Sequence, residues 1–323
     1  MPNQQEFLLR DDLKRVVETL HNEEDNVTPY REDYRRLLDN HGKMIRASLV
    51  LLFSYAVQPD KPKAAANLII TGAAAIEMLH LATLVHDDVL DNASVRRNQP
   101  TVQITRGNKA AIYLGDLILS RYMEIMATIA PDKDFIVEQA HTVNEIVAGD
   151  LLQESARHDI DVTKEYYERA IAGKTAALFR LAAITGVKLT IDSPSPETLE
   201  QAANFGEHLG IAFQILDDVE DFDVTHDTGK PKLEDIRDGI YTLPVILAIA
   251  ADRSFVDIVK LDDPLKVLDY FKTNPHFIDA AKQEALQHLE TAKNVITGDE
   301  YPTINPYTVK VLVNIIDKFT ATL

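Results

Sequence analysis

One stretch of the chain, residues 64–91, is apolar on nearly every face of a helix until it ends in three aspartates. Its sequence is AAANLIITGAAAIEMLHLATLVHDDVLD. A helix that is hydrophobic all round packs inside a core rather than on a surface. A helix of 28 residues spans roughly 42 Å, which is enough to cross a large domain. The stretch therefore predicts a core helix in a large α-helical protein.

The three aspartates Asp87, Asp88 and Asp91 close this predicted helix. Carboxylates at a helix C-terminus lie at the negative end of the macrodipole, which costs about 0.3–1 kcal/mol each. Positions i and i+4 share a helix face, so Asp87 and Asp91 point the same way. Like charges this close repel one another unless a cation lies between them, and carboxylate oxygens suit Mg²⁺. The cluster indicates either a cation site or a solvated acidic helix end.

A second apolar stretch, residues 204–221, ends in the same way. The first stretch ends in DDVLD and the second in DDVED, so Asp217 and Asp221 also share a helix face. Mg²⁺ usually binds through one or two protein carboxylates and completes its shell with water and substrate phosphates. Two matching clusters on two apolar helices therefore favour a site for a metal-bound diphosphate over two solvated helix ends.

Composition limits the class of protein. The chain has 323 residues, no cysteine and a net charge of −18, which repels nucleic acid and anionic lipid heads. Without cysteine there is no disulfide framework and no thiolate chemistry. The N-terminus lacks the pattern of a secretory signal, and charges interrupt the longest apolar run, so we expect no transmembrane segment. We expect a soluble cytoplasmic protein with no nucleic-acid partner.

Helical periodicity predominates along the whole chain. No linker-like composition, short repeat or low-complexity tract divides it, which predicts one all-α domain over residues 1–323. Ser195 before Pro196 is a strong helix start, and the polar stretch after Asp91 predicts a loop. The expected helices cover residues 5–22, 31–40, 41–56, 64–91, 107–129, 134–155, 163–187 and 195–221, with four or five shorter ones from 243 to 321.

Cations accompany both aspartate clusters. Lys43 and Arg46 follow Gly42 at a helix start, an arrangement typical of phosphate binding. Any one cation alone is more simply a surface charge, but together they indicate a shared polyanion. His80, two turns before Asp88, is as readily a core histidine as a ligand contact. The other cations near the clusters are Arg96, Arg97, Lys174 beside Thr175, and Lys230.

Several segments together resemble the trans-isoprenyl diphosphate synthases, also called polyprenyl synthetases. The matching segments are HGKMIR, EMLHLATLVHDDVLD with RRNQPT, GDLLQ, GKTAALF, FQILDDVEDF and GKPKLEDIRDGIYTLP. They cover nearly the whole chain and are highly specific in combination. A terpene cyclase shares one aspartate motif but pairs it with an Asn/Ser/Glu triad, which does not follow the first motif here. The resemblance implies the isoprenoid synthase fold, a single-domain bundle of long core helices around a central cavity.

The resemblance also implies an activity and a set of site residues. The activity is a Mg²⁺-dependent prenyltransferase that condenses isopentenyl diphosphate head-to-tail with an allylic diphosphate. Several Mg²⁺ ions are implied, with the ligands Asp87, Asp91 and Asp217. The residues implied around the allylic diphosphate are Arg96, Lys174, Thr175, Gln214 and Lys230, and those around isopentenyl diphosphate are Gly42, Lys43, Arg46, His80 and Arg97. The residues implied in catalysis are Asp87, Asp88, Asp91, Arg96, Lys174, Asp217, Asp218 and Lys230.

Five positions depart from the family's motifs. They are His41, Ala47, Asn98, Leu233 and Ile240, which stand in place of glycine, proline, glycine, glycine and lysine. Asparagine tolerates a positive φ, so Asn98 is a mild change. Leu233 is the larger change, and it lies close to Lys230. None of the five replaces an aspartate.

The first apolar helix also carries the residues expected to set product length. Ala82 and Thr83 lie five and four residues before Asp87, in the layer that forms the floor of the product pocket in the family. Short-chain members tend to place an aromatic residue there. These small residues let a product grow toward Leu79 and Ile76, unless another helix supplies a bulky stopper. We predict a medium- to long-chain product of the hexaprenyl or heptaprenyl class, with a farnesyl or geranylgeranyl product as the alternative.

The resemblance implies a homodimer as well. Two alternatives to an autonomous enzyme are a regulatory subunit that keeps the fold and a catalytic subunit that needs a small accessory partner. The intact aspartates and arginines argue against a regulatory subunit, because such a subunit has no need of a costly charge cluster.

Overall fold

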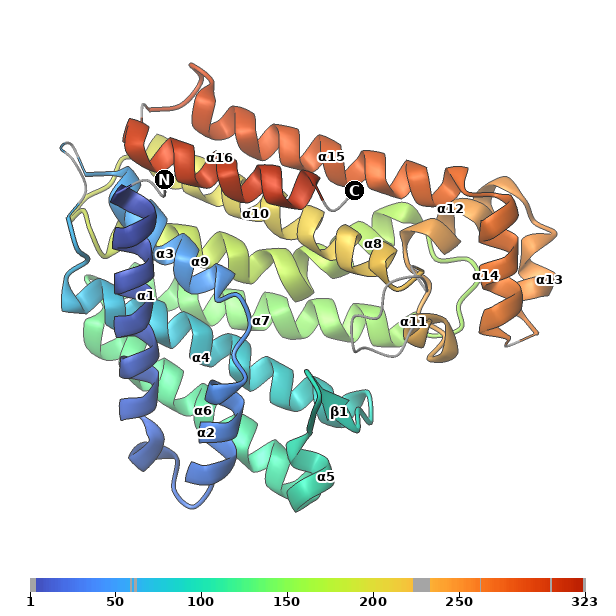
Figure 1. Ribbon diagram of the computed structural model, residues 1–323, viewed down its shortest axis with the longest axis horizontal. Helices are drawn as coiled ribbons and strands as arrows, with labels where there is room; N and C mark the ends of the chain where they lie inside the picture. Colours follow the sequence, from blue (N-terminus) through green and yellow to red (C-terminus); the bar gives the residue numbers. More distant parts are fainter. Residues whose placement is uncertain are drawn as a thin grey trace. The chain divides into compact units, whose positions relative to one another are not determined.

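The structure is a computed structural model that describes residues 4–58, 60, 63–222, 233–261, 263–302 and 304–321. Nearly all of its regular structure is helical, as the sequence predicts (Figure 1). Up to residue 129 the helices are α1 (Gln4–Asn22), the 3₁₀ turn η1 (Glu24–Val27), α2 (Arg31–Asp39), α3 (Ile45–Ala56), α4 (Asn67–Leu90), α5 (Val102–Arg106) and α6 (Asn108–Ile129). Next come α7 (Lys133–Ser155), α8 (Lys164–Ile171), the π-helical turn η2 (Ala172–Ala176), α9 (Ala177–Lys188) and α10 (Pro196–Glu220). The last are α11 (Glu234–Arg237), α12 (Leu243–Ala251), α13 (Phe255–Val259), α14 (Pro264–Thr273), α15 (His276–Thr297) and α16 (Pro306–Thr320).

The chain divides into two compact units. The first unit contains residues 1–140, 181–203 and 299–313, and the second contains residues 141–180, 204–298 and 314–323. Helices α7, α9, α10 and α16 therefore contribute residues to both units. One domain over residues 1–323 stays a prediction.

Helix α4 is the core helix that its composition predicts. It packs against α1, α3 and α6 within the first unit, and Figure 1 shows α4 and α6 side by side. The helix begins three residues later than expected, at Asn67, and Asp91 caps its C-terminus through a bond from the Asp91 N–H to the carbonyl of Asp87 (2.8 Å). The first aspartate cluster therefore lies on the last turn of a buried helix.

The polar stretch after Asp91 contains a small β-hairpin where the sequence predicted only a loop. Strand β1 (Val95–Arg96) pairs antiparallel with β2 (Gln99–Pro100). The two turn residues have positive φ angles, 48° at Arg97 and 63° at Asn98. Positive φ at both central residues is the geometry of a type I′ turn, in which asparagine is favoured. The turn fixes the direction in which Arg96 and Arg97 leave the backbone.

The helix expected over residues 163–187 is interrupted at its middle by η2, which contains Lys174 and Thr175. Two glycines allow a close backbone approach there. A Cβ on Gly149 of α7 would lie 2.2 Å from the backbone nitrogen of Lys174, and one on Gly173 would lie 2.7 Å from the carbonyl oxygen of Glu145. Neither position therefore accepts a side chain without a shift of the backbone. The π turn is thus held directly against the backbone of α7.

Among the described residues from 243 onward there are five helices, α12 to α16, at the upper end of the number expected. In the second unit, α12, α13, α14 and the start of α15 enclose an apolar core with edge-on aromatic contacts, such as Phe222 with Phe271 at a centroid distance of 4.9 Å. Two segments, Asn67–Leu90 and Lys164–Lys188, are long and apolar enough to cross a membrane by length and composition. Both are mostly buried inside the protein, with 61% and 78% of their apolar windows enclosed. Core helices of a soluble protein have the same properties.

Candidate active site

The first aspartate cluster is held together by the β-hairpin. Asp88 is only 2% exposed, and Arg96 Nε donates to its Oδ1 at 2.6 Å. Gln103 supports the helix end by donating from Nε2 to the carbonyl oxygens of Asp88 (2.6 Å) and Ala93 (2.8 Å). Burial raises the pKa of Asp88 above its usual value, while the Arg96 guanidinium opposes that rise. Arg96 thus neutralises the buried carboxylate of the motif.

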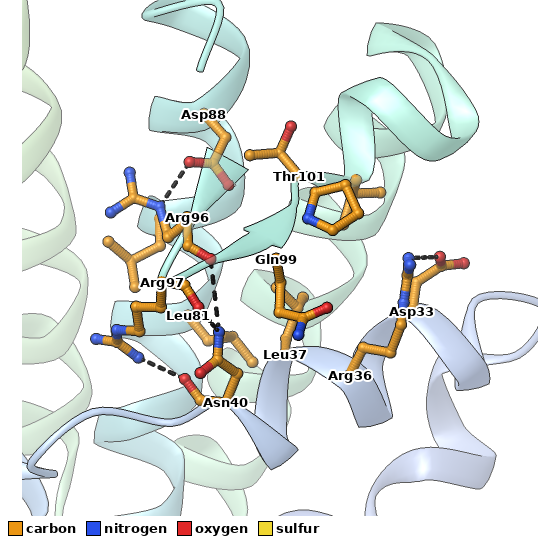
Figure 2. Close-up of a pocket in the computed structure, with 13 residues that line it drawn as sticks. Asp33, Arg36, Leu37, Asn40, Leu81, Asp88, Arg96, Arg97, Gln99 and Thr101 are labelled. Carbon is orange, nitrogen blue, oxygen red and sulfur yellow. Dashed lines mark hydrogen bonds and ion pairs between the residues drawn. The ribbon is translucent and has the colours of Figure 1, made fainter. Parts of the chain in front are cut away.

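A small cavity lies beside this cluster in the first unit (Figure 2). Its volume of about 40 Å³ has room for a few water molecules and not for a prenyl chain. Asn40, at the end of α2, connects to the hairpin here: its Nδ2 donates to the carbonyl oxygen of Arg97 at 3.2 Å, and its own carbonyl accepts from the Arg97 guanidinium at 2.8 Å. Asn40 was not predicted from the sequence, because no motif points to it. The cavity is lined by Asp33, Arg36, Leu37, Asn40, Leu81, Leu84, Asp88, Arg96, Arg97, Gln99, Pro100, Thr101 and Val102.

The residues expected around isopentenyl diphosphate all belong to the first unit. Gly42 lies against Arg97, because a Cβ on Gly42 would be 2.5 Å from the guanidinium nitrogen Nη2 of Arg97. Lys43 is exposed and precedes Met44, whose left-handed backbone (φ 49°) leads into α3. The structure thus brings the GKMIR segment and the arginine pair together.

Electrostatics around Arg46 and His80 favour an anion. Burial lowers the pKa of Arg46 to about 10. Burial also lowers the pKa of His80 well below its usual value, and Arg46 and Arg97 add to that shift by charge repulsion. His80 is therefore neutral near pH 7 and can both donate and accept a hydrogen bond. Glu77, one turn before His80, accepts from the backbone N–H of Ala47 at 2.9 Å and was not predicted from the sequence.

The second aspartate cluster lies at the end of α10, in the second unit. Asp218 is 4% exposed and accepts from Tyr167 Oη at 2.5 Å and from Gln214 Nε2 at 2.7 Å. Burial raises the pKa of Asp218 to about 7 against the effect of these two bonds, and the Asp217 charge adds to the rise. Burial likewise raises the pKa of Asp235, with further contributions from Asp218, Asp221 and Asp217. Neither Tyr167 nor Asp235 was predicted from the sequence.

Lys174, Thr175 and Gln214 also meet in the second unit. Lys174 Nζ donates to Gln153 Oε1 at 2.8 Å and pairs with Asp150 at 3.0 Å. Thr175 Oγ1 donates to Gln214 Oε1 at 2.5 Å, and Gln214 in turn holds Asp218. The π turn η2 is therefore connected by hydrogen bonds to the second aspartate cluster. Lys230 lies outside the described residues.

The departure at Leu233 has a definite geometry. Its backbone takes φ 59°, a left-handed conformation that glycine favours and that leucine rarely adopts. Its N–H donates to Asp221 Oδ1 at 2.7 Å, and its side chain is 2% exposed in the core beside Phe222 and Ile236. Burial of the leucine side chain offsets the backbone strain. Ile240 donates its N–H to the carbonyl of Asp235 at 2.7 Å.

The residues expected to set product length lie along α4. Ile76, Leu79 and Ala82 are buried, and Thr83 is partly buried with its hydroxyl donating to the carbonyl of His80 at 2.8 Å. None of them lines the small cavity beside Arg96. Their role in product length stays a prediction.

The ligand chemistry of both clusters suits Mg²⁺, because every candidate ligand is a carboxylate oxygen. Within the described part of the chain, no three histidine, cysteine, aspartate or glutamate side chains already form a complete metal site.

Comparison with known proteins adds an independent result. The sequence pattern of the Polyprenyl synthetase family matches residues 28–266. A nonaprenyl diphosphate synthase of Rhodobacter capsulatus, described as geranyl-diphosphate specific, is 37% identical over 217 residues, which are 67% of this chain and 64% of that protein. Component 2 of the heptaprenyl diphosphate synthase of Geobacillus stearothermophilus is 35% identical over 247 residues, 76% of this chain and 75% of its own length. The chain thus spans 64% to 75% of these two relatives.

Solved structures agree with the predicted fold. A decaprenyl diphosphate synthase of Rhodobacter capsulatus superposes with a TM-score of 0.84 at 27% identity, over 97% of this chain and 96% of that one. The heptaprenyl diphosphate synthase of Staphylococcus aureus superposes with a TM-score of 0.86 at 24% identity, over 97% of this chain and 98% of that one. These likenesses confirm the predicted fold class.

Proposed function

Since the chain belongs to the polyprenyl synthetase family, we propose that it is a Mg²⁺-dependent prenyltransferase. The proposed reaction is the head-to-tail condensation of isopentenyl diphosphate with an allylic diphosphate. One observation carries the proposal most directly. Each aspartate motif ends an apolar helix, and each lies near cationic side chains: Arg96 beside Asp88, and Lys174 within electrostatic reach of Asp218.

In the first unit, we assign Asp87 and Asp91 to Mg²⁺ and Arg96 to the allylic diphosphate. The bond from Arg96 to Asp88 supports this division, because it gives the buried carboxylate a protein partner, while Asp87 and Asp91 lie one turn apart at the end of α4. The residues assigned to isopentenyl diphosphate are Gly42, Lys43, Arg46, His80 and Arg97. Their clustering around a neutral His80 and a partly buried Arg46 supports an anionic ligand.

In the second unit, we assign Asp217 to Mg²⁺. We assign Lys174, Thr175, Gln214 and Lys230 to the allylic diphosphate. The bond from Thr175 to Gln214 supports a common role for these two side chains.

The chemistry follows from these assignments. Bound Mg²⁺ stabilises the charge that develops on the departing diphosphate. Arg96 and Lys174 hold phosphate oxygens with charge-assisted hydrogen bonds while the C–O bond of the allylic substrate breaks. The double bond of isopentenyl diphosphate attacks the resulting allylic cation, and the proton lost in that step passes to the released diphosphate. The apolar side chains of α4 keep water from the cation.

We propose a product of the hexaprenyl or heptaprenyl class. The small residues Ala82 and Thr83 support it, as does the heptaprenyl name of one relative, and the nonaprenyl name of another favours a longer product over a farnesyl or geranylgeranyl one. Ala82→Phe fills the layer before Asp87, so the product is expected to shorten by one or more isoprene units. Thr83→Ser is the matched control, because it keeps the layer small. A product of unchanged mass from Ala82→Phe would move the floor of the pocket elsewhere.

The function is tested by incubating the purified chain alone with farnesyl diphosphate, isopentenyl diphosphate and Mg²⁺, and measuring product mass. We expect a series of elongated polyprenyl diphosphates. A cyclic hydrocarbon formed without isopentenyl diphosphate would instead indicate a terpene cyclase.

A second candidate function is the catalytic subunit of a heteromeric synthase. The relative named component 2 of a heptaprenyl synthase favours it. An absence of elongation by the isolated chain, restored by a small partner protein, would identify this case. The homodimer and the cytoplasmic location stay predictions that rest on the resemblance and on composition.

A further inference from the structure

Tyr167 is a buried residue of α8 that none of the assignments above uses. Its side chain is 4% exposed, and its hydroxyl donates to Asp218 Oδ2 at 2.5 Å. Asp218 is itself 4% exposed and lies next to Asp217 on α10. A buried carboxylate without donors is costly, so this bond fixes both the position and the orientation of the Asp218 carboxylate.

The other carboxylate oxygen of Asp218 is held as well. Gln214 Nε2 donates to Oδ1 at 2.7 Å, and Gln214 Oε1 accepts from Thr175 Oγ1 at 2.5 Å. The hydrogen bonds therefore run from α8 through α10 to the π turn η2. Both of these Asp218 donors are neutral, so they orient the carboxylate without cancelling its charge.

This arrangement separates two roles within the second motif. Asp218 directs both of its oxygens to side-chain donors, whereas Asp217 precedes it on the last turn of α10. Asp221 lies just past the end of that helix and accepts the backbone N–H of Leu233 at 2.7 Å. We propose that Tyr167 is a positioning residue: through Asp218 it fixes the end of α10, so that Asp217 presents its carboxylate to the metal. The inference rests on the proposed function, because it assigns Tyr167 a part in the same metal site.

The test uses Tyr167→Phe, which removes the hydroxyl and keeps the ring. The measurement is the affinity of the full-length protein for Mg²⁺ in the presence of inorganic diphosphate, by calorimetry and without turnover. Partners that orient metal ligands typically contribute about 10–100-fold to metal affinity. We expect Tyr167→Phe to weaken Mg²⁺ binding by about 10-fold and to lower kcat, with the KM for isopentenyl diphosphate unchanged.

The matched control is Tyr55→Phe in the first unit. Tyr55 is 1% exposed and donates to the buried Asp12 at 2.6 Å, so the control loses the same kind of bond away from both motifs. We expect it to lower Tm and to leave Mg²⁺ affinity unchanged. Equal Mg²⁺ affinity in Tyr167→Phe and the unsubstituted protein would overturn the inference, as would an equal loss in both tyrosine variants.

A double-mutant cycle tests whether Tyr167 acts through Asp218. In the Asp218→Asn background the buried charge is gone, so Tyr167→Phe is expected to cause no further loss of Mg²⁺ affinity. A full additional loss in that background would contradict the proposed route. If the unsubstituted protein bound no Mg²⁺ in the presence of diphosphate, the proposed function itself would be wrong. If it bound Mg²⁺ and Tyr167→Phe bound Mg²⁺ equally well, only the role of Tyr167 would be wrong.

Discussion

The two aspartate motifs have nearly the same sequence, DDVLD and DDVED, but their buried second aspartates have different partners. Asp88 is bonded to a cation, the guanidinium of Arg96. Asp218 is bonded to two neutral groups, the hydroxyl of Tyr167 and the amide of Gln214. The first cluster therefore carries its own countercharge, whereas the donors that orient Asp218 leave its charge in place.

The difference indicates how the two clusters depend on metal. In the second unit, Asp235 adds a further carboxylate. The charge of Asp217 adds to the raised pKa of Asp218, and the charges of Asp218, Asp221 and Asp217 add to the raised pKa of Asp235. Lys174 offsets part of this repulsion from a distance, but no cation is hydrogen-bonded to Asp218 as Arg96 is to Asp88. Divalent metal is therefore expected to stabilise this cluster more than the first, since it relieves the repulsion that remains.

The largest expected effect comes from removing a proposed metal ligand. Asp87→Ala and Asp217→Ala are each expected to lower kcat by about 10³-fold or more, because metal stabilisation of the leaving group contributes several kcal/mol. Circular dichroism should show an unchanged helical fold in both variants. Full activity in either variant would exclude that aspartate as a ligand.

Substitutions at the same two positions are also expected to change the stability of the metal-free protein by different amounts. Asp217→Asn removes a charge that repels Asp218 and Asp235, so the metal-free protein is expected to gain stability. Asp87→Asn is expected to change it less, because Arg96 already neutralises Asp88. Thermal unfolding in EDTA gives the Tm of both variants. A larger rise in Tm for Asp87→Asn than for Asp217→Asn would contradict the expected difference between the two clusters.

Removing the countercharge of the first cluster is the next largest effect. Arg96→Gln leaves Asp88 buried without its cation, which is expected to cost about 1–3 kcal/mol of unfolding free energy. Adding Asp88→Asn should restore most of that loss, since the amide needs no cation. Urea unfolding of the single and double variants measures these changes in unfolding free energy. Equal stability of Arg96→Gln and the unsubstituted protein would show that the ion pair contributes nothing.

These differences also show what could be predicted from the sequence. The apolar helices and their aspartate ends follow from composition and periodicity, and Arg96 could be proposed because it lies five residues after Asp91. Tyr167 could not be proposed, because it is 51 residues from Asp218 and only the packing of α8 on α10 brings them together. The π turn at Lys174 and the type I′ turn at Arg97 were also missed. They depend on glycine contacts and paired φ angles that helical periodicity does not encode.

A smaller effect, on the pH dependence of stability, is expected from a histidine pair in the second unit that lies apart from the aspartate cluster. His208 and His288 share a hydrogen bond between their Nδ1 atoms (2.8 Å), and burial lowers the pKa of both below 6.5. At these two histidines the unfolded chain thus binds more protons just below pH 6.5, so the contribution of this pair to stability is complete above that pH and falls as the pH drops through it. Glu207 and Glu284 oppose this loss by attracting a proton, and Lys164 adds to it.

The double variant His208→Gln/His288→Gln is expected to remove this pH dependence and to cost on the order of 1 kcal/mol at neutral pH. Unfolding free energies measured from pH 5 to pH 8 test it. The same slope in the double variant would assign the pH dependence to other groups. Metal titrations that compare the two clusters are therefore best made above pH 7.

The smallest effect concerns the turn that carries Arg97. Asn98 has φ 63° and an exposed side chain, so Asn98→Gly is expected to change unfolding free energy by no more than about 0.5 kcal/mol and to keep activity. Asn98→Val, which disfavours that backbone, is the contrasting variant and should raise the KM for isopentenyl diphosphate through Arg97. An unchanged KM in Asn98→Val would mean that the turn does not position Arg97.

The most direct test of the account is a Mg²⁺ titration of chain elongation, with farnesyl diphosphate, isopentenyl diphosphate and the unsubstituted protein. We expect no polyprenyl product in EDTA, product that rises with Mg²⁺, and no recovery in Asp87→Ala or Asp217→Ala at any Mg²⁺ concentration. Elongation that persists in EDTA, or that saturates normally in either variant, would contradict it.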